Sequence, residues 1–175
     1  MQHLLIADAG PLIALARIQQ LVLLCQLFRT VTITAVVAGE LGCGLPAAEQ
    51  AQLPGTAALL EALEAGWIVI SDFEASAADQ PLNPGVDAGE ASAIGLALRL
   101  QAAGEQVLLL IDDRCGRAEA RHRGLAIIGT AAVLVLAKEQ QLIAACAPLL
   151  SAMREHGYYL SDDLLQAVLD QVAEG

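Results

Sequence analysis

The sequence predicts an α/β fold with a central, mostly parallel sheet. Short apolar runs of strand length alternate along the chain with stretches in which apolar residues recur at helical spacing. Residues 107–130 contain a strand, a helix and a second strand in succession, the βαβ unit that produces parallel pairing. Acidic residues directly follow some of these strands, at the edge where open parallel sheets carry their ligand crevices.

Five segments have the length and composition of strands, because each is a short run of mainly apolar or β-branched residues. They cover residues 4–7, 31–34, 67–71, 107–111 and 125–128. Asp8 ends the first strand, and the pair Asp112 and Asp113 ends the fourth. The fourth strand is apolar throughout, which is typical of a strand buried on both faces of a sheet.

In the first half of the chain, apolar residues at helical spacing predict four helices. They cover residues 11–18, residues 21–28, a segment from Ala35 to beyond Glu40, and residues 56–66. The Ala-Gly-Pro segment after Asp8 breaks the apolar run, and Pro11 suits the first turn of the helix that follows. Thr56 is a candidate N-cap and Gly66 a natural stop. Residues 42–55 form a loop with room for one turn of helix.

In the second half, helices are predicted over residues 87–104, 114–124, 130–141, 144–156 and 161–172. Asp87 and Glu90 fall in the first turn of the first of these, where the helix dipole favours acids whatever their function. The same holds for Asp162 and Asp163 in the last helix. Residues 72–86 are the most loop-like stretch, and they form either a flap over a site or a plain surface connection.

The composition bounds the class of protein. The 175 residues suit a single domain, with the helices from about residue 144 to 173 as a C-terminal extension. Hydrophobic residues make up 56% of the chain, but no apolar run approaches the ~18 residues of a membrane-spanning helix. The start lacks the basic segment of a signal peptide, so we expect a cytoplasmic protein with no membrane partner. The 4 cysteines lie far apart, so a zinc site is not expected.

The charge is distributed unevenly. A net charge of -11 argues against broad, non-specific binding to nucleic acid. Four of the 9 basic residues nevertheless fall in the helix after Asp113. Arg114, Arg117 and Arg121 are spaced to share one face of that helix. This face either positions phosphate groups or is a solvated face whose arginines neutralise nearby acids.

Acids also recur at the end of a strand or one helix beyond it. They are Asp8, Glu40, Glu90 and the pair Asp112 and Asp113. If the strands are parallel, these carboxylates meet at one sheet edge, where they would repel one another unless a cation neutralised them. Mg²⁺ or Mn²⁺ held by carboxylates can activate water and stabilise an in-line displacement at phosphate. The pattern therefore favours a metal-dependent phosphodiesterase.

Four motifs in this order resemble those of PIN-domain proteins, particularly a prokaryotic branch related to VapC-type toxin ribonucleases. They are Ile-Ala-Asp8-Ala-Gly-Pro-Leu-Ile, Thr-Ala-Val-Val-Ala-Gly-Glu40-Leu, Gly89-Glu90-Ala-Ser-Ala-Ile-Gly-Leu-Ala, and Leu-Ile-Asp112-Asp113-Arg-Cys-Gly-Arg117 followed by Gly129-Thr130. The resemblance covers roughly residues 3–160. It implies a three-layer α/β/α fold, Mg²⁺ or Mn²⁺ in an acidic pocket, and cleavage directed at single-stranded RNA.

The resemblance also implies roles for the acids. Asp8, Glu40 and Glu90 match the first three acids of the family, and the fourth is either Asp112 or Asp113. Many members have threonine, then asparagine or arginine, then one aspartate at this point, so the doubled aspartate leaves the register open. Asp8, Glu90 and the aspartate pair would hold the metal, while Glu40 would complete the site or orient the attacking water.

We therefore expect a divalent-metal-dependent endoribonuclease, and a candidate toxin of a toxin–antitoxin pair with an antitoxin protein as partner. The arginines of the basic helix would bind RNA phosphate. The alternative is a PIN-like interaction or regulatory module without catalysis. The presence of the full set of acids argues against this alternative. A phosphoacceptor domain of the receiver type is disfavoured, because the acid pair follows a late strand and Lys138 is the only lysine.

A homodimer is also expected. A hydrophobic content of 56% leaves more apolar surface than one small domain easily hides, and two-fold dimers are the commonest way to cover it. The apolar C-terminal helices, or the helix from Pro11, would contribute the interface.

Overall fold

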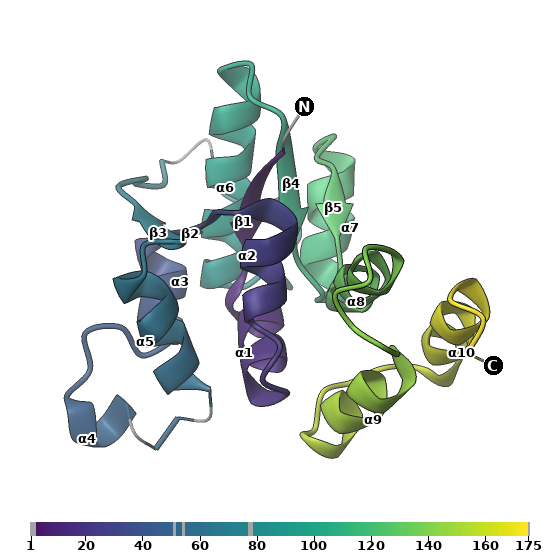
Figure 1. Cartoon of the computed structure of the whole chain (residues 1–175). Helices are drawn as coiled ribbons and strands as arrows, with labels where there is room; N and C mark the ends of the chain where they lie inside the picture. The colour runs from purple at the N-terminus through teal and green to yellow at the C-terminus, as the bar shows by residue number, and fades with distance from the viewer. Residues whose placement is uncertain (1–2, 51, 54, 77–78, 175) are drawn as a thin grey trace.

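The computed structural model describes residues 3–50, 52, 53, 55–76 and 79–174. They contain a five-stranded sheet in the order β3-β2-β1-β4-β5, in which all neighbouring strands are parallel. The strands are β1 (Leu4–Ala7), β2 (Val31–Thr34), β3 (Ile68–Ser71), β4 (Val107–Leu110) and β5 (Ile127–Ile128). Helices lie on both sides of this sheet in Figure 1. The predicted three-layer α/β/α fold is confirmed.

Helices follow the strands nearly as predicted. Their bounds are α1 (Ala9–Arg17), α2 (Val22–Phe28), α3 (Ala35–Glu40), α4 (Ala47–Gln50), α5 (Thr56–Glu64), α6 (Ala88–Ala102), α7 (Arg114–His122), α8 (Thr130–Glu139), α9 (Ala147–Glu155) and α10 (Asp162–Gln171). The apolar side chains of α6 and α7 belong to one hydrophobic core, and those of α1, α2, α5, α8, α9 and α10 belong to a second. The sheet separates these two cores.

The central strands contribute to both cores because successive side chains of a strand point to opposite faces. In β1, Leu5 and Ala7 belong to the larger core, and Ile6 between them belongs to the smaller one. In β4, Leu110 belongs to the larger core and Leu109 to the smaller one. This explains why these strands are continuous apolar runs in the sequence rather than alternating patterns.

The start of α1 differs from the prediction. The helix begins at Ala9, directly after the strand, because Asp8 is its N-cap. The Oδ2 atom of Asp8 accepts a hydrogen bond from the backbone N–H of Gly10 at 3.3 Å. The Ala-Gly-Pro segment is therefore the first turn of the helix rather than a break, and Pro11 fits there because its missing N–H would have no partner.

Two other predicted element boundaries were wrong. Thr56 does not cap α5, because the N-cap is Gly55, which has a φ of 85° and no side-chain oxygen to offer. Glycine suits this left-handed conformation, and a Cβ atom there would lie 2.7 Å from the Cβ of Ala16. The last strand covers Ile127–Ile128 rather than residues 125–128, because pairing with β4 reaches only these two residues.

The segment 72–86 is bound to α7 at several points. The backbone N–H groups of Leu82 and Asn83 donate to the carboxylate of Glu119 at 2.9 and 3.2 Å. The Arg123 side chain donates to Glu119 at 2.7 Å and also to the backbone carbonyl of Gln80. These bonds make it an anchored surface connection. Positions 77 and 78 of this predicted loop, like 51 and 54 of the preceding one, lie outside the described residues.

The predicted C-terminal extension is part of the same hydrophobic core as the first helices. Cys146, Leu150, Met153 and Val168 are buried together with side chains of α1 and α2. In Figure 1, α9 and α10 (green to yellow) lie beside α8 on one side of the sheet. The C-terminal helices are therefore packed against α1 and α2. This packing brings the segment between α9 and α10 to the sheet edge.

No single helix among the described residues is long and apolar enough to cross a membrane. Only α1 and α2 taken together reach the required length, and the chain bends by 118° between them.

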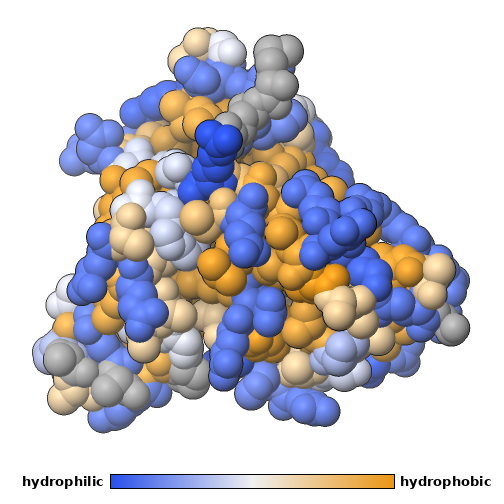
Figure 2. Space-filling model, in the orientation of Figure 1, coloured by the Kyte–Doolittle hydropathy of each residue, from blue (hydrophilic) through white to orange (hydrophobic). Residues whose placement is uncertain are grey.

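The exposed apolar side chains do not identify a dimer interface. In α1, Leu12 and Leu15 are fully buried within the protein's own core, so this helix has no free apolar stripe. In α10, Leu164 is 44% exposed. Figure 2 shows hydrophobic residues (orange) interspersed with hydrophilic ones (blue) across the face of the molecule drawn there. The homodimer stays a prediction.

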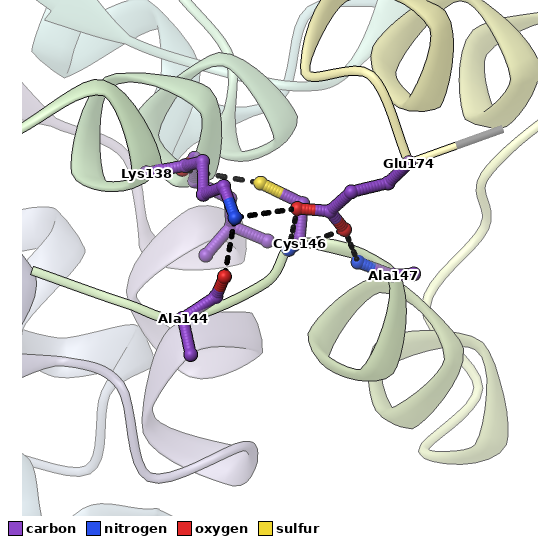
Figure 3. Close-up of polar contacts among 6 residues, drawn as sticks. Lys138, Ala144, Cys146, Ala147 and Glu174 are labelled. Carbon is purple, nitrogen blue, oxygen red and sulfur yellow. Dashed lines mark hydrogen bonds and ion pairs between the residues drawn. The ribbon is translucent and has the colours of Figure 1, made fainter. Parts of the chain in front are cut away.

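A carboxylate near the C-terminus holds the start of α9 in place (Figure 3). Glu174 accepts hydrogen bonds from the backbone N–H groups of Cys146 and Ala147, both at 2.8 Å from its Oε2 atom. The ammonium of Lys138 lies 3.3 Å from its Oε1 atom and donates to the carbonyl of Ala144. Glu174 therefore caps one helix from a distant part of the chain and ties it to α8.

We predict that Glu174→Gln lowers the thermal unfolding midpoint by a few degrees at pH 7, and that the difference is smaller at pH 3. The hydrogen bond from Ala147, with the others, lowers the pKa of Glu174 below its ordinary 4.5. A lowered pKa stabilises the fold above the unfolded-state pKa, and this stability is lost as the pH falls through the folded-state pKa. Glu105→Gln, at an exposed position, is the control. An equal difference at both pH values would contradict the assignment.

Candidate active site

A cavity of about 610 Å³ lies at the carboxyl ends of β1 and β4. Six carboxylate side chains line it, those of Asp8, Glu40, Asp87, Glu90, Asp112 and Asp113. The parallel sheet brings together all five acids singled out in the sequence, although they are spread over more than a hundred positions, because parallel strands end at one edge. The sixth, Asp87, had been interpreted only as an acid favoured by a helix start.

Asp8 is the most enclosed aspartate of the group. Its residue is 7% exposed, and burial raises its pKa from 3.8 to about 6. Hydrogen bonds from the backbone of Ala9 and Gly10 oppose this shift, while the charges of Asp87 and Asp112 increase it. The side chain thus has two tasks, because it caps α1 and contributes negative charge to the cavity.

Asp87 and Glu90 form a reciprocal capping box at the start of α6. The backbone N–H of Glu90 donates to Asp87 at 2.8 Å, and that of Asp87 donates to Glu90 at 3.1 Å. Burial raises the pKa of Glu90 from 4.5 to about 7, and the nearby charges of Asp87 and Asp113 add to the shift. The three-residue spacing of the two acids was the sequence signal that could have placed Asp87 in the site.

Glu40 reaches the cavity from the end of α3 by lying against the first turn of α6. A Cβ atom on Gly89 would be 2.4 Å from the Oε2 atom of Glu40, so a larger residue there would require the Glu40 carboxylate to move. The backbone N–H of Gly89 donates to it, while burial and the charges of Asp87 and Asp8 raise the pKa of Glu40 above 4.5. The helix carrying Glu40 is thereby fixed against the one carrying Glu90.

Asp112 is held by groups from two distant segments. Its Oδ1 atom accepts from the backbone N–H of Thr130 at 2.9 Å. Its Oδ2 atom accepts from the hydroxyl groups of Thr130 and Tyr158. Burial, followed by the charge of Asp112, raises the pKa of the Tyr158 phenol. Neither residue had been assigned this role from the sequence. The Gly129-Thr130 motif pointed to the first, but no local pattern pairs Tyr158 with a residue 46 positions away.

Asp113 has a different set of partners. Its Oδ1 atom is the N-cap acceptor of α7, with the backbone N–H groups of Cys115 at 2.6 Å and Gly116 at 3.2 Å. It is exposed, whereas Asp112 is half-buried. Both aspartates therefore line the cavity, but different elements orient them. The choice between them as the fourth acid stays open.

The three arginines of the basic helix do not share one environment. Arg114 lines the cavity. The Nη1 atom of Arg117 donates to the backbone carbonyl of Ile111 at 2.9 Å, so at least part of this guanidinium supports the loop after β4. Arg121 is exposed and does not line the cavity. Of the three, only Arg114 lines the cavity beside the acids.

The opposite wall of the cavity comes from the C-terminal segment. Tyr158, Tyr159, Leu160, Ser161 and Leu164 line it. This wall is aromatic and apolar apart from the hydroxyl groups of Tyr158, Tyr159 and Ser161, whereas the wall at the strand ends is acidic. Sequence reasoning missed the segment because nothing local to it indicates that α9 packs against α1.

The acids of the cavity suit a hard divalent cation by their chemistry. The four side-chain ion pairs among the described residues involve other acids, so no basic side chain forms an ion pair with the six carboxylates. Oxygen donors without thiolate or imidazole are the ligands preferred by Mg²⁺ and Mn²⁺. Among the described residues, however, no three acidic, histidine or cysteine side chains already converge as a cation site. The donor set therefore fits the cation by its chemistry.

Comparison with known protein families identifies a match over most of the chain. The model of the family DUF3368, described as a PIN domain, matches residues 4–174. No curated protein matches the chain.

We predict that the metal-free protein becomes more stable as the pH falls from about 8 to about 5. Burial and charge crowding raise the folded-state pKa of Asp8 from 3.8 to about 6 and of Glu90 from 4.5 to about 7. Protons therefore bind the folded chain more tightly, and stability decreases as the pH rises through this window. For Asp8 alone the effect is at most about 3 kcal/mol, at ~1.4 kcal/mol per pKa unit.

The measurement is the thermal unfolding midpoint in chelator as a function of pH. Asp8→Asn keeps an oxygen that can cap α1 but cannot ionise, so its midpoint should vary less with pH than that of the parent. Asp163→Asn, at an exposed position in α10, is the control and should follow the parent. Identical pH profiles for the parent and Asp8→Asn would contradict the prediction.

Proposed function

The chain belongs to the PIN-domain family, and from this premise we propose that it is a Mg²⁺- or Mn²⁺-dependent endoribonuclease. PIN domains are generally nucleases, which supports a hydrolase acting on nucleic acid. The observation that carries the proposal is the cavity lined by six carboxylates, none of which has a basic ion-pair partner among the described residues. Such a concentration of negative charge is unfavourable by itself and becomes favourable when a cation binds.

In this proposal, Asp8, Glu90, Asp112 and Asp113 hold the cation. When bound, it would neutralise charge on the scissile phosphate and lower the pKa of a water molecule. Thr130 and Tyr158 orient Asp112, because both donate hydrogen bonds to its carboxylate. Glu40, fixed against Gly89, is placed at the side of the cavity to accept a proton from the attacking water or to orient it.

Arg114 supplies the phosphate contact at the mouth of the cavity. A guanidinium there can bind the RNA backbone beside the scissile phosphate and partly offset the net charge of -11. Arg121 is exposed on the same helix and adds charge farther from the acids. We further propose that the enzyme is the toxin of a toxin–antitoxin pair. The order of its four motifs supports this, and the antitoxin protein would be its partner.

We predict that Asp8→Asn lowers the rate of Mn²⁺-dependent cleavage of single-stranded RNA by at least about a hundredfold, since the loss of groups that hold a metal costs at least this order of activity. The amide preserves the N-cap of α1, so circular dichroism should show an unchanged fold. Asp163→Asn should cleave like the parent. Asp112→Asn and Asp113→Asn, measured in parallel, show whether one or both aspartates are required. Full activity of Asp8→Asn would refute the metal-site assignment, and absence of cleavage by the parent would favour a non-catalytic module.

A separate prediction concerns metal binding without turnover. Millimolar Mn²⁺ should raise the unfolding midpoint and excess chelator should reverse the rise, because a ligand that binds only the folded state stabilises it. At a hundredfold excess over Kd the gain is about 2.7 kcal/mol, or roughly 5–10 °C for a domain of this size. Asp8→Asn should show a smaller rise. If Mn²⁺ does not change the unfolding midpoint of the parent protein, the protein has no such site.

A further inference from the structure

The C-terminal wall of the cavity contains an aromatic side chain that is largely exposed. Tyr159 is 87% exposed and yet lines the acidic cavity. Its two neighbours point inward, since Tyr158 binds Asp112 and Leu160 is buried in the larger core. These two inward anchors fix the short extended segment, so the ring of Tyr159 is held at the mouth of the cavity facing solvent.

Further hollows lie beyond Tyr158. A second cavity of about 190 Å³ shares Gly10 and Tyr158 with the first, and Arg17 and His156 also line it. A third, of about 670 Å³, shares Arg17 and His156 with the second. These neighbouring hollows outline a path from the acids to the end of α1. Arg17 lies nine residues after Asp8, or roughly 13 Å along the helix.

Basic groups stand at both ends of this path. Arg114 borders the acidic cavity on the side of α7. Arg17 lines the two further hollows and forms no ion pair within the described residues; its Nη1 atom donates to the carbonyl of His156 at 3.1 Å. The remaining guanidinium nitrogens of Arg17 are available to an anion. A flat ring at the mouth and a cation farther along are the two features with which proteins bind single-stranded nucleic acid.

We infer that a single strand of RNA runs from Arg114 across the acids, stacks one base on Tyr159 and places a phosphate several nucleotides away on Arg17. This inference rests on the proposed nuclease function. It adds the route of the substrate strand across the protein surface and one residue that contacts a base. Bases in a duplex have both faces covered, so Tyr159 discriminates in favour of single strands. Ile13 and Met153, in the wall between Tyr158 and Arg17, give this part of the path an apolar floor.

The test combines kinetics and fluorescence with the Mn²⁺-loaded protein and a short single-stranded RNA. Tyr159→Ala should raise KM about tenfold, as expected for loss of one stacked base, while kcat stays within about twofold. Tyr159→Phe should behave like the parent, since the ring remains. In Tyr159→Trp, rapid mixing with the RNA before cleavage should quench the new tryptophan, whereas a duplex of the same sequence should not. Leu82→Ala, which removes a 71% exposed side chain elsewhere, is the matched control.

Arg17→Gln tests the other end of the path. Glutamine keeps an N–H donor for the His156 carbonyl but removes the charge, so the slope of log affinity against log salt should fall by about 0.7, the value for one phosphate of a single strand. Arg29→Gln, an equal charge change outside the walls of the three cavities, should leave the slope unchanged.

The outcomes separate the two proposals. In one outcome the parent cleaves RNA, Tyr159→Ala has the parental KM, and RNA does not quench the tryptophan of Tyr159→Trp. This outcome overturns the strand path and leaves the nuclease proposal standing. If the parent binds RNA with quenching of Tyr159→Trp but does not cleave, the path stands and the nuclease proposal fails. A parent that neither binds nor cleaves RNA overturns both, and Tyr159 would then be a contact for a protein partner.

Discussion

The crowding of six carboxylates at one edge of a parallel sheet is the constraint on which the rest of this structure depends. Burial and mutual repulsion raise the pKa values of Asp8, Glu40 and Glu90, and among the described residues no arginine or lysine forms an ion pair with any of the six. Such an arrangement opposes folding at neutral pH, because the ionised forms of Asp8, Glu40 and Glu90 are stabilised less in the cavity than in water. The surrounding backbone must therefore compensate, and under the proposed function a bound cation would add to this compensation.

Much of this compensation comes from helix N-termini. Asp8, Asp87 and Asp113 are the N-caps of α1, α6 and α7, and all three line the cavity. Each accepts hydrogen bonds from the first turn of its helix, whose partial positive charge favours an anion. Since an acid between a strand and the following helix occupies the sheet edge and the helix start at once, the same residue can cap and line the site. The βα connection itself thus supplies the acid cluster.

Close approach fixes the remaining acids. Glu40 is accommodated because Gly89 has no side chain, and a Cβ atom on Gly116 would lie 2.9 Å from the carboxyl carbon of Glu90. Asp112 is oriented by Tyr158, a residue from the segment between α9 and α10. That segment is positioned by the burial of Leu150 and Met153 against the first helices, and Glu174 secures the start of α9. The C-terminal helices therefore complete the site as well as the core.

The sequence by itself determined the fold class, the strands and the five predicted acids, because strand length, helical spacing and an acid after a strand are local signals. It could not determine which partners those acids meet. Asp87 looked like an ordinary helix cap, Thr56 looked like a cap and is not one, and Arg117 binds the Ile111 carbonyl. Only the tertiary structure brought Tyr158 to Asp112 and left Tyr159 at the mouth of the cavity, because contacts between distant segments depend on how the helices pack on the sheet, which no local pattern encodes.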